Sequence, residues 1–432
     1  MNSRLGLVLG LGALLVAATL AAADPAKDTD DLISHILKDD GPPKPALSGA
    51  KPGPEPVVMS ARIGEHEDRT RFVVEVSDPV QMRVFTLSNP DRVVIDMPAV
   101  QWHLDGPPRP SGTGAVRSYR YGLFRSGNSR FVIDLNKPMK VSDPLVLPPS
   151  GGYGYRVVID LFPASPDQFA RSSGWPADLK AREAAAEQLA ALPPAAPTPE
   201  KHIVVIDAGH GGIDTGTSGV NGLQEKDLVL DEALRLGREL ARRPNYTVHL
   251  TRDTDVYIPL KERVAIARSW HADLFISLHA DSNPDPNVNG LSIYTLSDAG
   301  SDKEAVALAR KENQSDVIAG VDLGGGNSTV APILIDLAQR DTMNRSSRFA
   351  TGAVASLTSM TDILPRQPHR AAAFVVLKAP DVPAVLIELG YLSNQADASQ
   401  MNAVRWRNSV AGAIAHAVDG YFSPVTASSP YP

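Results

Sequence analysis

Three short apolar runs, each followed by an ionisable side chain, constrain the fold of the C-terminal half of this chain more than any other feature. Residues 203–206, 274–278 and 384–387 are apolar except for Ser277 and rich in β-branched side chains, as expected for parallel strands buried on both faces. His210, His279 and Glu388 follow these runs. Because ligands in open α/β sheets bind outside the carboxyl ends of the strands, we expect these three side chains to meet on one rim.

Glu225 reaches the same rim by a different route. A glycine-rich loop over 209–222 separates it from the first strand, and an amphipathic run over 226–240 follows it, so it lies near a helix start. Two imidazoles and one carboxylate, with a fourth position left to water, form a common catalytic zinc set, whereas structural zinc sites are closed by four ligands that usually include cysteine. The chain has no cysteine. The pattern predicts one zinc ion bound by His210, Glu225 and His279.

Glu388 is then available for proton transfer. Zinc lowers the pKa of its bound water to about 7, and a carboxylate outside the ligand shell can accept that proton and pass it to a departing amine. The four residues together predict zinc-dependent amide hydrolysis.

The motifs that carry these residues resemble a known family. IVVIDAGHGGIDTG, GLQEKDLVL, SLHAD and VLKAPDVPAVLIELGYLSN occur in this order within 202–422 and are similar to the zinc-dependent N-acetylmuramoyl-L-alanine amidases of bacterial cell-wall turnover. The resemblance implies that His210, Glu225 and His279 bind zinc and that Glu388 is the catalytic glutamate. It implies cleavage of peptidoglycan between N-acetylmuramic acid and the L-alanine of the stem peptide, in cell-wall turnover and daughter-cell separation.

Residues 1–23 indicate export. They contain one cation, a long apolar stretch and an Ala-Ala-Ala ending before Asp24, which is typical of a secretory signal peptide; an uncleaved membrane anchor is the alternative. We expect the mature protein to be a periplasmic monomer that does not span the membrane. Recruitment to the division septum stays open. The formal net charge of −7 argues against nucleic acid as the main partner. Residues 24–56 are expected to be a disordered lead-in, and residues 424–432 a tail.

Residues 57–163 contain an internal repeat. RIG at 62–64 resembles RYG at 120–122, RFVVEV at 71–76 resembles RFVIDL at 130–135, and DRVVIDMP at 91–98 resembles YRVVIDLFP at 155–163. Alternating apolar residues and proline turns predict an all-β sandwich in which two similar halves face each other. The region resembles the AMIN domain, which in this family targets the enzyme to the cell wall; a generic β-sandwich spacer is the alternative.

An aromatic and cationic cluster within this domain has two interpretations. Its members, Arg117, Tyr119, Arg120, Tyr121 and Arg125, suit sugar faces and peptide carboxylates. They also suit a solvated strand face with cross-strand pairs.

The remaining chain is expected to form a linker and an α/β catalytic domain. Residues 164–201 are rich in alanine and proline, which predicts a semi-rigid linker with a helix over 178–192. Alternating helical and strand patterns over 202–423 predict a mainly parallel sheet flanked by helices. The expected helices cover 226–242, 260–270, 346–360 and 403–421, and further strands cover 247–251 and 290–295.

An insertion at about 300–345, with a glycine hinge at 324–326, interrupts this alternation. In the family that the chain resembles, a helix in this insertion covers the active site until a partner displaces it, and one of its glutamates can occupy the open zinc position. The ENQSD segment resembles that helix and nominates Glu312 as an inhibitory ligand. The implied partner is an activator of the degenerate LytM-domain type. Alternatively, Glu304 and Glu312 lie on a solvated helix face among basic residues.

Several further residues and functions stay open. His369, upstream of a predicted strand FVVLKAP, and Arg263 are candidates for substrate contact, and Arg263 or Asp281 for orienting a ligand. His249 and His416 are expected to be packing or surface residues. Two other functions fit parts of the pattern: a non-catalytic wall-binding scaffold, and a zinc carboxypeptidase, which would need a basic residue to bind a free carboxylate.

Overall fold

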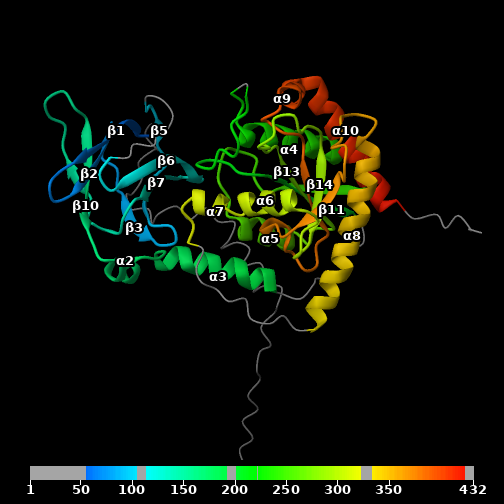
Figure 1. Ribbon diagram of the computed structural model, residues 1–432, viewed down its shortest axis with the longest axis horizontal. Helices are drawn as coiled ribbons and strands as arrows, with labels where there is room; N and C mark the ends of the chain where they lie inside the picture. The colour runs from blue at the N-terminus through cyan, green and yellow to red at the C-terminus, as the bar shows by residue number, and fades with distance from the viewer. Residues whose placement is uncertain (1–54, 105–112, 192–200, 221, 323–332, 424–432) are drawn as a thin grey trace, which may run out of the picture.

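The computed structural model describes residues 55–104, 113–191, 201–220, 222–322 and 333–423. The signal peptide, nearly all of the lead-in, the glycine hinge at 324–326 and the tail lie outside these residues. The chain forms an N-terminal β domain and a C-terminal α/β domain, and helix α3 (Ala177–Ala191) runs beneath both (Figure 1). None of the helices in the described ranges combines the length and the hydropathy that crossing a bilayer requires.

The β domain consists of two packed sheets. One has the order β5-β1-β2-β10-β8, with β9 also paired to β10, and the other has the order β3-β4-β7-β6. Alternate residues such as Phe72, Ile95, Phe131 and Ile159 point inward and form one core. The strands are β1 (Val57–Glu65), β2 (Thr70–Val76), β3 (Arg83–Leu87), β4 (Arg92–Pro98), β5 (Gln101–Trp102), β6 (Val116–Arg125), β7 (Asn128–Leu135), β8 (Met139–Val141), β9 (Leu145–Leu147) and β10 (Tyr155–Pro163).

The two halves of the repeat exchange a strand, so they do not face each other as separate units. Strand β10 of the second half pairs with β2 of the first, and β4 of the first half pairs with β7 of the second. Asp160 lies opposite Arg71 in one sheet, and Asp96 lies opposite Arg130 in the other. Each sheet therefore contains a hairpin of one half and the third strand of the other, with the same Arg–Asp pair on its outer face.

The segment after the β domain is docked along its described length, which differs from the expected tether. Helix α2 (Pro166–Ser172) follows the last β strand, and α3 corresponds to the predicted helix. Arg182 and Glu183 of α3 pair with Glu262 and Lys261 of helix α5 (Leu260–Ser269), with N–O distances of 3.2 Å for both pairs. Trp175 is buried in a cluster that draws on both domains. The composition of this segment predicted a linker, but these ion pairs and this buried side chain attach its described part to both domains.

The two domains also contact each other directly. The backbone N–H of Ile213 donates to Leu123 O at 3.1 Å, and a Cβ on Gly122 would lie 2.8 Å from Ile213 Cα. Arg125 pairs with Glu262 at 2.5 Å. The aromatic and cationic cluster was expected to be either a ligand-binding surface or a solvated strand face. Neither applies to Arg125, because the α/β domain covers it. Tyr119 and Tyr121 pack on Phe131 of the core.

The α/β domain is built on a six-stranded sheet of order β12-β11-β13-β16-β14-β15. Its neighbouring strands are parallel except for the β14–β16 pair, so the predicted mainly parallel sheet is confirmed. The strands are β11 (His202–Ala208), β12 (Tyr246–Leu250), β13 (Leu274–His279), β14 (Ser292–Leu296), β15 (His369–Ala372) and β16 (Ala384–Glu388).

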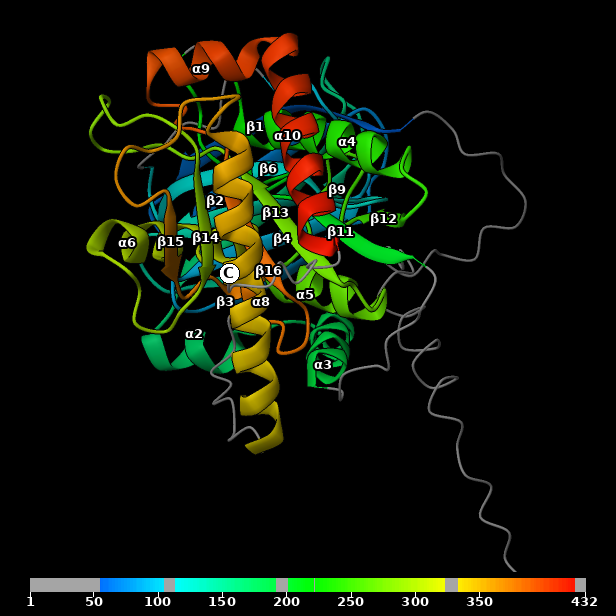
Figure 2. The same cartoon turned by 90° about the vertical axis from the view of Figure 1, so that its right-hand side faces the viewer.

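Helices cover both faces of this sheet. One face packs on α4 (Glu225–Ala241), α8 (Ile333–Leu357) and α10 (Val404–Phe422) (Figure 2). The other face packs on α5, α6 (Lys303–Glu312) and the 3-10 helix η1 (Val375–Leu377). Helices α7 (Ser315–Ile318) and α9 (Gln395–Asn402) complete the domain. The central strands are thus buried on both sides, which explains their continuous apolar runs.

One predicted helix of this domain starts earlier than expected, and one predicted strand was wrong. The helix expected over 346–360 is the second half of α8, which begins at Ile333 inside the expected insertion. The expected strand FVVLKAP is the 3-10 helix η1, because a single turn places Val376 and Leu377 in the core against α5. The edge strand is β15 instead, immediately before it.

The buried carboxyl of Glu232 gives the domain a testable pH dependence. Burial on α4 raises its pKa from the ordinary 4.5 to about 8. The folded state therefore binds a proton that the unfolded state releases between these values, so stability falls as the pH rises through this window. We expect Glu232→Gln to unfold at about the same temperature as the unsubstituted protein at pH 4.5 and to be more stable at pH 9, by about 1 kcal/mol or more.

Thermal unfolding followed by circular dichroism at both pH values checks this. Glu239→Gln, a partly exposed position on the same helix, is the control. If the unfolding temperatures of Glu232→Gln and the unsubstituted protein changed equally with pH, the raised pKa of Glu232 would be contradicted.

Candidate metal centre and active site

The side chains predicted to share a rim lie together at the carboxyl ends of the central strands. His279 is the last residue of β13 and lies opposite Glu388, the last residue of β16. His210 follows β11, which pairs with β13 on its other side. Glu225 is the first residue of α4. Because neighbouring strands are about 4.8 Å apart, this topology brings the four residues to one place.

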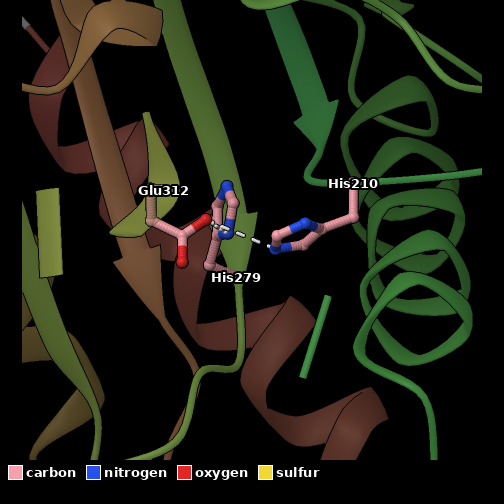
Figure 3. A group of neighbouring side chains, drawn as sticks. All are labelled: His210, His279 and Glu312. Atoms are coloured by element: carbon pink, nitrogen blue, oxygen red, sulfur yellow. Dashed lines mark ion pairs between the residues drawn. The ribbon is translucent and has the colours of Figure 1, made fainter. Parts of the chain in front are cut away.

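Four potential ligand atoms surround a common point. Glu225 Oε1 lies 3.1 Å from His210 Nε2 and 3.2 Å from His279 Nδ1. Glu312 Oε2 lies 3.3 Å from His210 Nε2 and 3.1 Å from His279 Nδ1. The carboxylate of Glu312 points toward the two imidazole rings (Figure 3), and all four side chains are buried.

The glycine-rich loop permits this close approach. A Cβ on Gly209 would lie 2.4 Å from Cε1 of His279, and a Cβ on Gly216 would lie 2.7 Å from both Glu225 Oε2 and His210 Cδ2. Gly216 also has a positive φ of 62°, which favours glycine. Larger residues at either position would displace the ligand side chains.

Second partners orient the ligand groups. His210 Nδ1 donates to Asp214 Oδ2 at 2.8 Å, and this contact turns its Nε2 toward Glu225 and Glu312. Asp214 also accepts hydrogen bonds from Gly216 N and from the Ser315 hydroxyl. The sequence analysis missed Asp214, although its position four residues after His210 within the same glycine-rich motif could have indicated it.

The carboxylate of Glu225 is held by backbone donors. Its Oε1 accepts from Ala280 N and its Oε2 from Thr217 N, each at 2.9 Å. Thr217 belongs to the glycine-rich loop, and Ala280 directly follows His279. The position of the Glu225 carboxylate is therefore fixed by the glycine-rich loop and by the residue that follows β13.

The electrostatics of the cluster fit a bound cation. Burial opposes charge on His210, yet the carboxylates of Glu225, Asp214 and Glu312 raise its pKa well above the ordinary value. Burial likewise opposes charge on His279, and Glu312 and Glu225 raise its pKa to about 10. Burial raises the pKa of Glu312, but the two imidazoles outweigh it and lower the pKa to about 2. Without a metal, protons on the imidazoles balance the buried carboxylates.

Two atoms of the cluster also lack hydrogen bonds. His210 Nε2 and Glu312 Oε2 are buried and make none within the described residues. Buried polar atoms normally have partners, and a metal ion between these atoms would supply one. Within the described part of the chain, His210, His279 and Glu312 have ligand atoms within 4.8 Å of one another. The donor set and its geometry therefore fit a divalent metal ion.

Glu388 lies beside this cluster and carries a free oxygen. Its Oε2 accepts from Asp281 N at 3.0 Å, whereas Oε1 is buried without a hydrogen bond among the described residues. Burial raises the pKa of Glu388 well above its ordinary value; His279 opposes this shift, and the carboxylates of Asp281 and Glu225 add to it. A buried carboxyl with a raised pKa and an oxygen left without a hydrogen bond suits general acid–base chemistry.

Glu312 is not on a solvated helix face. It ends α6 and is 5% exposed, whereas Glu304 on the same helix is accessible and pairs with Arg370. The adjacent Lys311 binds the carboxylate of Asp281 and donates to Thr217 Oγ1 at 3.0 Å. The C-terminal end of α6 is thus fastened over the rim of the sheet.

Arg263 and His369 have other positions than predicted. Arg263 is 1% exposed and donates to Asp207 Oδ1 at 2.8 Å and to the carbonyls of Ala208 and His210, each at 2.6 Å. The prediction of substrate contact was therefore wrong for Arg263, which instead holds the loop of His210. His369 begins the edge strand β15, two strands from Glu388, and contacts Thr295 Oγ1 at 3.1 Å. The structure does not bring His369 into the cluster.

His249 and His416 have packing or surface roles, as expected. His249 stacks on Trp270 with ring centroids 3.7 Å apart, and His416 is exposed.

Comparison with known families matches both domains. The protein-family model described as N-acetylmuramoyl-L-alanine amidase matches residues 204–420, and the AMIN domain model matches residues 56–146. The first match contains His210, Glu225, His279, Glu312 and Glu388. The second contains most of the β domain.

Curated relatives match over most of the chain. N-acetylmuramoyl-L-alanine amidase AmiC of Escherichia coli O6:H1 strain CFT073 is 30% identical over 85% of this chain and 89% of that protein. AmiC of Neisseria meningitidis serogroup B strain MC58 is 32% identical over 88% of this chain and 93% of that protein. Among solved structures, AmiC2 of Nostoc punctiforme is 26% identical, covers 52% of this chain and 98% of that chain, and has a TM-score of 0.37.

Proposed function

The chain belongs to the N-acetylmuramoyl-L-alanine amidase family, and we propose that it is a zinc-dependent member whose active site is closed by its own Glu312 in the resting state. It hydrolyses the amide bond between N-acetylmuramic acid and the L-alanine of the peptidoglycan stem peptide during cell separation. The observation that carries this proposal is the buried cluster of two histidines and two glutamates beside a third glutamate, Glu388, with a raised pKa.

His210, Glu225 and His279 would hold the zinc ion. Two imidazoles and one carboxylate are a ligand set of catalytic zinc sites, which keep a further position for water or substrate. When bound, the ion would supply Lewis-acid polarisation of the scissile carbonyl and lower the pKa of water. Asp214, Thr217 and Ala280 would keep the three ligands in orientation through the hydrogen bonds that they make.

Glu388 would move the proton. Asp281 N holds one of its carboxyl oxygens and leaves Oε1 without a hydrogen bond among the described residues, next to His279 of the neighbouring strand. With its raised pKa, this carboxyl can accept a proton from the attacking water and deliver it to the departing L-alanine nitrogen. The reaction separates the glycan from an intact stem peptide.

Glu312 would block the reaction by occupying the remaining position. Its Oε2 lies 3.1 to 3.3 Å from ligand atoms of both histidines, where water or substrate would otherwise bind. Lys311 secures the end of α6 by pairing with Asp281. We expect an activator, of the degenerate LytM-domain type implied by the family resemblance, to displace the segment around 300–345.

The β domain and the N-terminus suggest where the enzyme acts. The AMIN match supports a role of the β domain in binding the cell wall, and residues 1–23 would direct export to the periplasm. We propose that a monomer works there, probing peptidoglycan through one domain and cleaving it through the other. We propose that the wall-binding domain comprises residues 57–163 and that the catalytic domain comprises residues 202–423.

The carboxypeptidase alternative lacks support at the site. Such an enzyme needs a cation to bind a free carboxylate near the metal. Arg252 and Arg263 near the loop of His210 donate to backbone carbonyls of residues 208–210, and Lys311 pairs with Asp281. These three cations therefore already have partners within the chain.

Product analysis tests the proposed reaction and its inhibition. We expect zinc-loaded Glu312→Ala to release intact stem peptides that begin with L-alanine from purified peptidoglycan, at least about tenfold faster than the unsubstituted chain, because the blocking carboxylate is gone. Mass spectrometry of the released peptides, with and without a chelator, measures this. Glu304→Ala, on the exposed face of the same helix, should hydrolyse peptidoglycan at the rate of the unsubstituted chain.

Two outcomes would contradict the proposal. Shortened stems still attached to sugar would indicate a carboxypeptidase, and no products from any form would favour a scaffold.

Replacing Glu388 tests the proton-transfer role. In the Glu312→Ala background, we expect Glu388→Gln to keep its zinc and to lose at least about two orders of magnitude in turnover, the usual scale for general acid–base catalysis. Metal analysis and turnover are measured on the same samples. Glu232→Gln, which removes another buried carboxyl away from the rim, is the control. Near-normal turnover would refute the role, and loss of zinc would make Glu388 a ligand.

A further inference from the structure

The segment that carries Glu312 is held by the β domain as well as by the α/β domain. The backbone carbonyls of residues 317–321, in the last residues of α7 and just after it, face the outer surface of the sheet β3-β4-β7-β6. In Figure 1, α7 lies between the two domains, next to β7 on one side and α6 on the other. The contacts at this surface come from side chains that the proposed reaction does not use.

Three arginines of the β domain bind these carbonyls. Arg92 Nη1 donates to Val317 O at 2.9 Å and to Val321 O at 3.4 Å. Arg120 Nη2 donates to Val317 O at 3.1 Å, and its Nε donates to Ile318 O. Arg130 Nη1 donates to Ala319 O and Gly320 O, each at 3.1 Å. Cations that bind the free carbonyls at a helix C-terminus stabilise the end of that helix.

Apolar packing completes the contact. Ala319 and Val321 are buried in one cluster with Val94, Val132 and Trp175, which belong to the β domain and the segment after it. Gly320 has a positive φ of 68°, and a Cβ there would lie 2.8 Å from Val132 Cγ2. The segment therefore fits closely against this sheet and cannot leave the active site without breaking these contacts.

The same segment is connected to Glu312 over a few residues. Ser315 donates to Asp214, the partner of His210, and Asp316 Oδ1 accepts from the Tyr257 hydroxyl at 2.7 Å and from Leu260 N at 3.0 Å. Residues 312–321 thus form one short stretch with the blocking carboxylate at one end and the arginine-bound carbonyls at the other. Release of either end would loosen the other.

We propose that Arg92, Arg120 and Arg130 form a latch through which the β domain keeps the blocking segment closed. The latch rests on the proposed blocking role of Glu312. It couples the two domains: when the β domain separates from residues 317–321, the restraint on Glu312 is lost without any change at the ligands themselves. The three arginines are positioning residues, since they touch the segment and not the reacting groups.

The internal repeat offers a comparison within the same molecule. Arg62, Arg71 and Arg156 occupy the equivalent positions in the other sheet and keep partners within the β domain, namely Glu75, Asp160 and Ser150. The pair of Arg120 with Asp134 matches that of Arg62 with Glu75, and the pair of Arg130 with Asp96 matches that of Arg71 with Asp160. The side chain of Arg62 is 58% exposed and that of Arg120 is 20% exposed. The three latch arginines thus differ from their equivalents in the other sheet in that they bind residues 317–321.

Amide hydrogen exchange tests the latch directly. We expect the double variant Arg92→Met/Arg120→Ala of the full zinc-loaded chain to exchange at least about tenfold faster in peptides covering 313–321, because four donated hydrogen bonds are lost. Arg156→Met/Arg62→Ala removes the equivalent cations from the other sheet and should exchange there like the unsubstituted chain. Exchange in β13 serves as the check that each variant is folded, and Arg120→Ala alone is the milder replacement if the double variant fails this check.

Hydrolysis of purified peptidoglycan separates the latch from the block. We expect the latch variant to raise basal hydrolysis, and to add little in the Glu312→Ala background, since both changes open the same site. Unchanged exchange over 313–321 would overturn the latch whatever Glu312 does. Faster exchange with unchanged hydrolysis in both the latch variant and Glu312→Ala would retain the latch as a contact and refute the block.

Discussion

The buried cluster of two imidazoles and two carboxylates at the end of the α/β sheet is the interaction on which the rest of the structure depends. Removing one member of a buried charged set leaves the others uncompensated, at a cost of several kcal/mol. The fold meets this constraint from several sides: β11 and β13 deliver the histidines, α4 begins at Glu225, and α6 ends at Glu312. Arg263 and Asp214 then hold the loop of His210. A metal ion at this point would replace the protons that otherwise balance the carboxylates.

The position of Glu312 connects the chemistry of the site to the arrangement of the domains. A carboxylate that completed the ligand set would keep the resting enzyme inactive, and its removal would restore an open position. Because the residues after α7 lie against the β domain, the proposed wall-binding domain and the catalytic domain would share one restraint. Regulation would then act on a short segment between the two domains, while the catalytic groups stay in place.

Local patterns predicted the elements well, and long-range contacts account for what they missed. The apolar runs before His279 and Glu388 predicted both strands and their shared rim, because buried parallel strands leave a direct record in the sequence. The register shared by repeated motifs predicted the β sandwich, but the exchange of β4 and β10 between the sheets depends on pairing between distant residues. The docking of α3 depends on Arg182 meeting Glu262, and Arg263 and Arg120 have partners that spacing alone does not indicate. Glu312 came from family resemblance, since its helix carries ordinary surface residues around it.

The most direct test of the central claim is anomalous diffraction at the zinc edge from crystals of the zinc-loaded full chain. We predict one peak per chain, about 2.0–2.2 Å from a nitrogen of His210, a nitrogen of His279, an oxygen of Glu225 and an oxygen of Glu312. A peak held by the first three residues with Glu312 turned away would contradict the closed resting state. A peak elsewhere would contradict the metal centre itself.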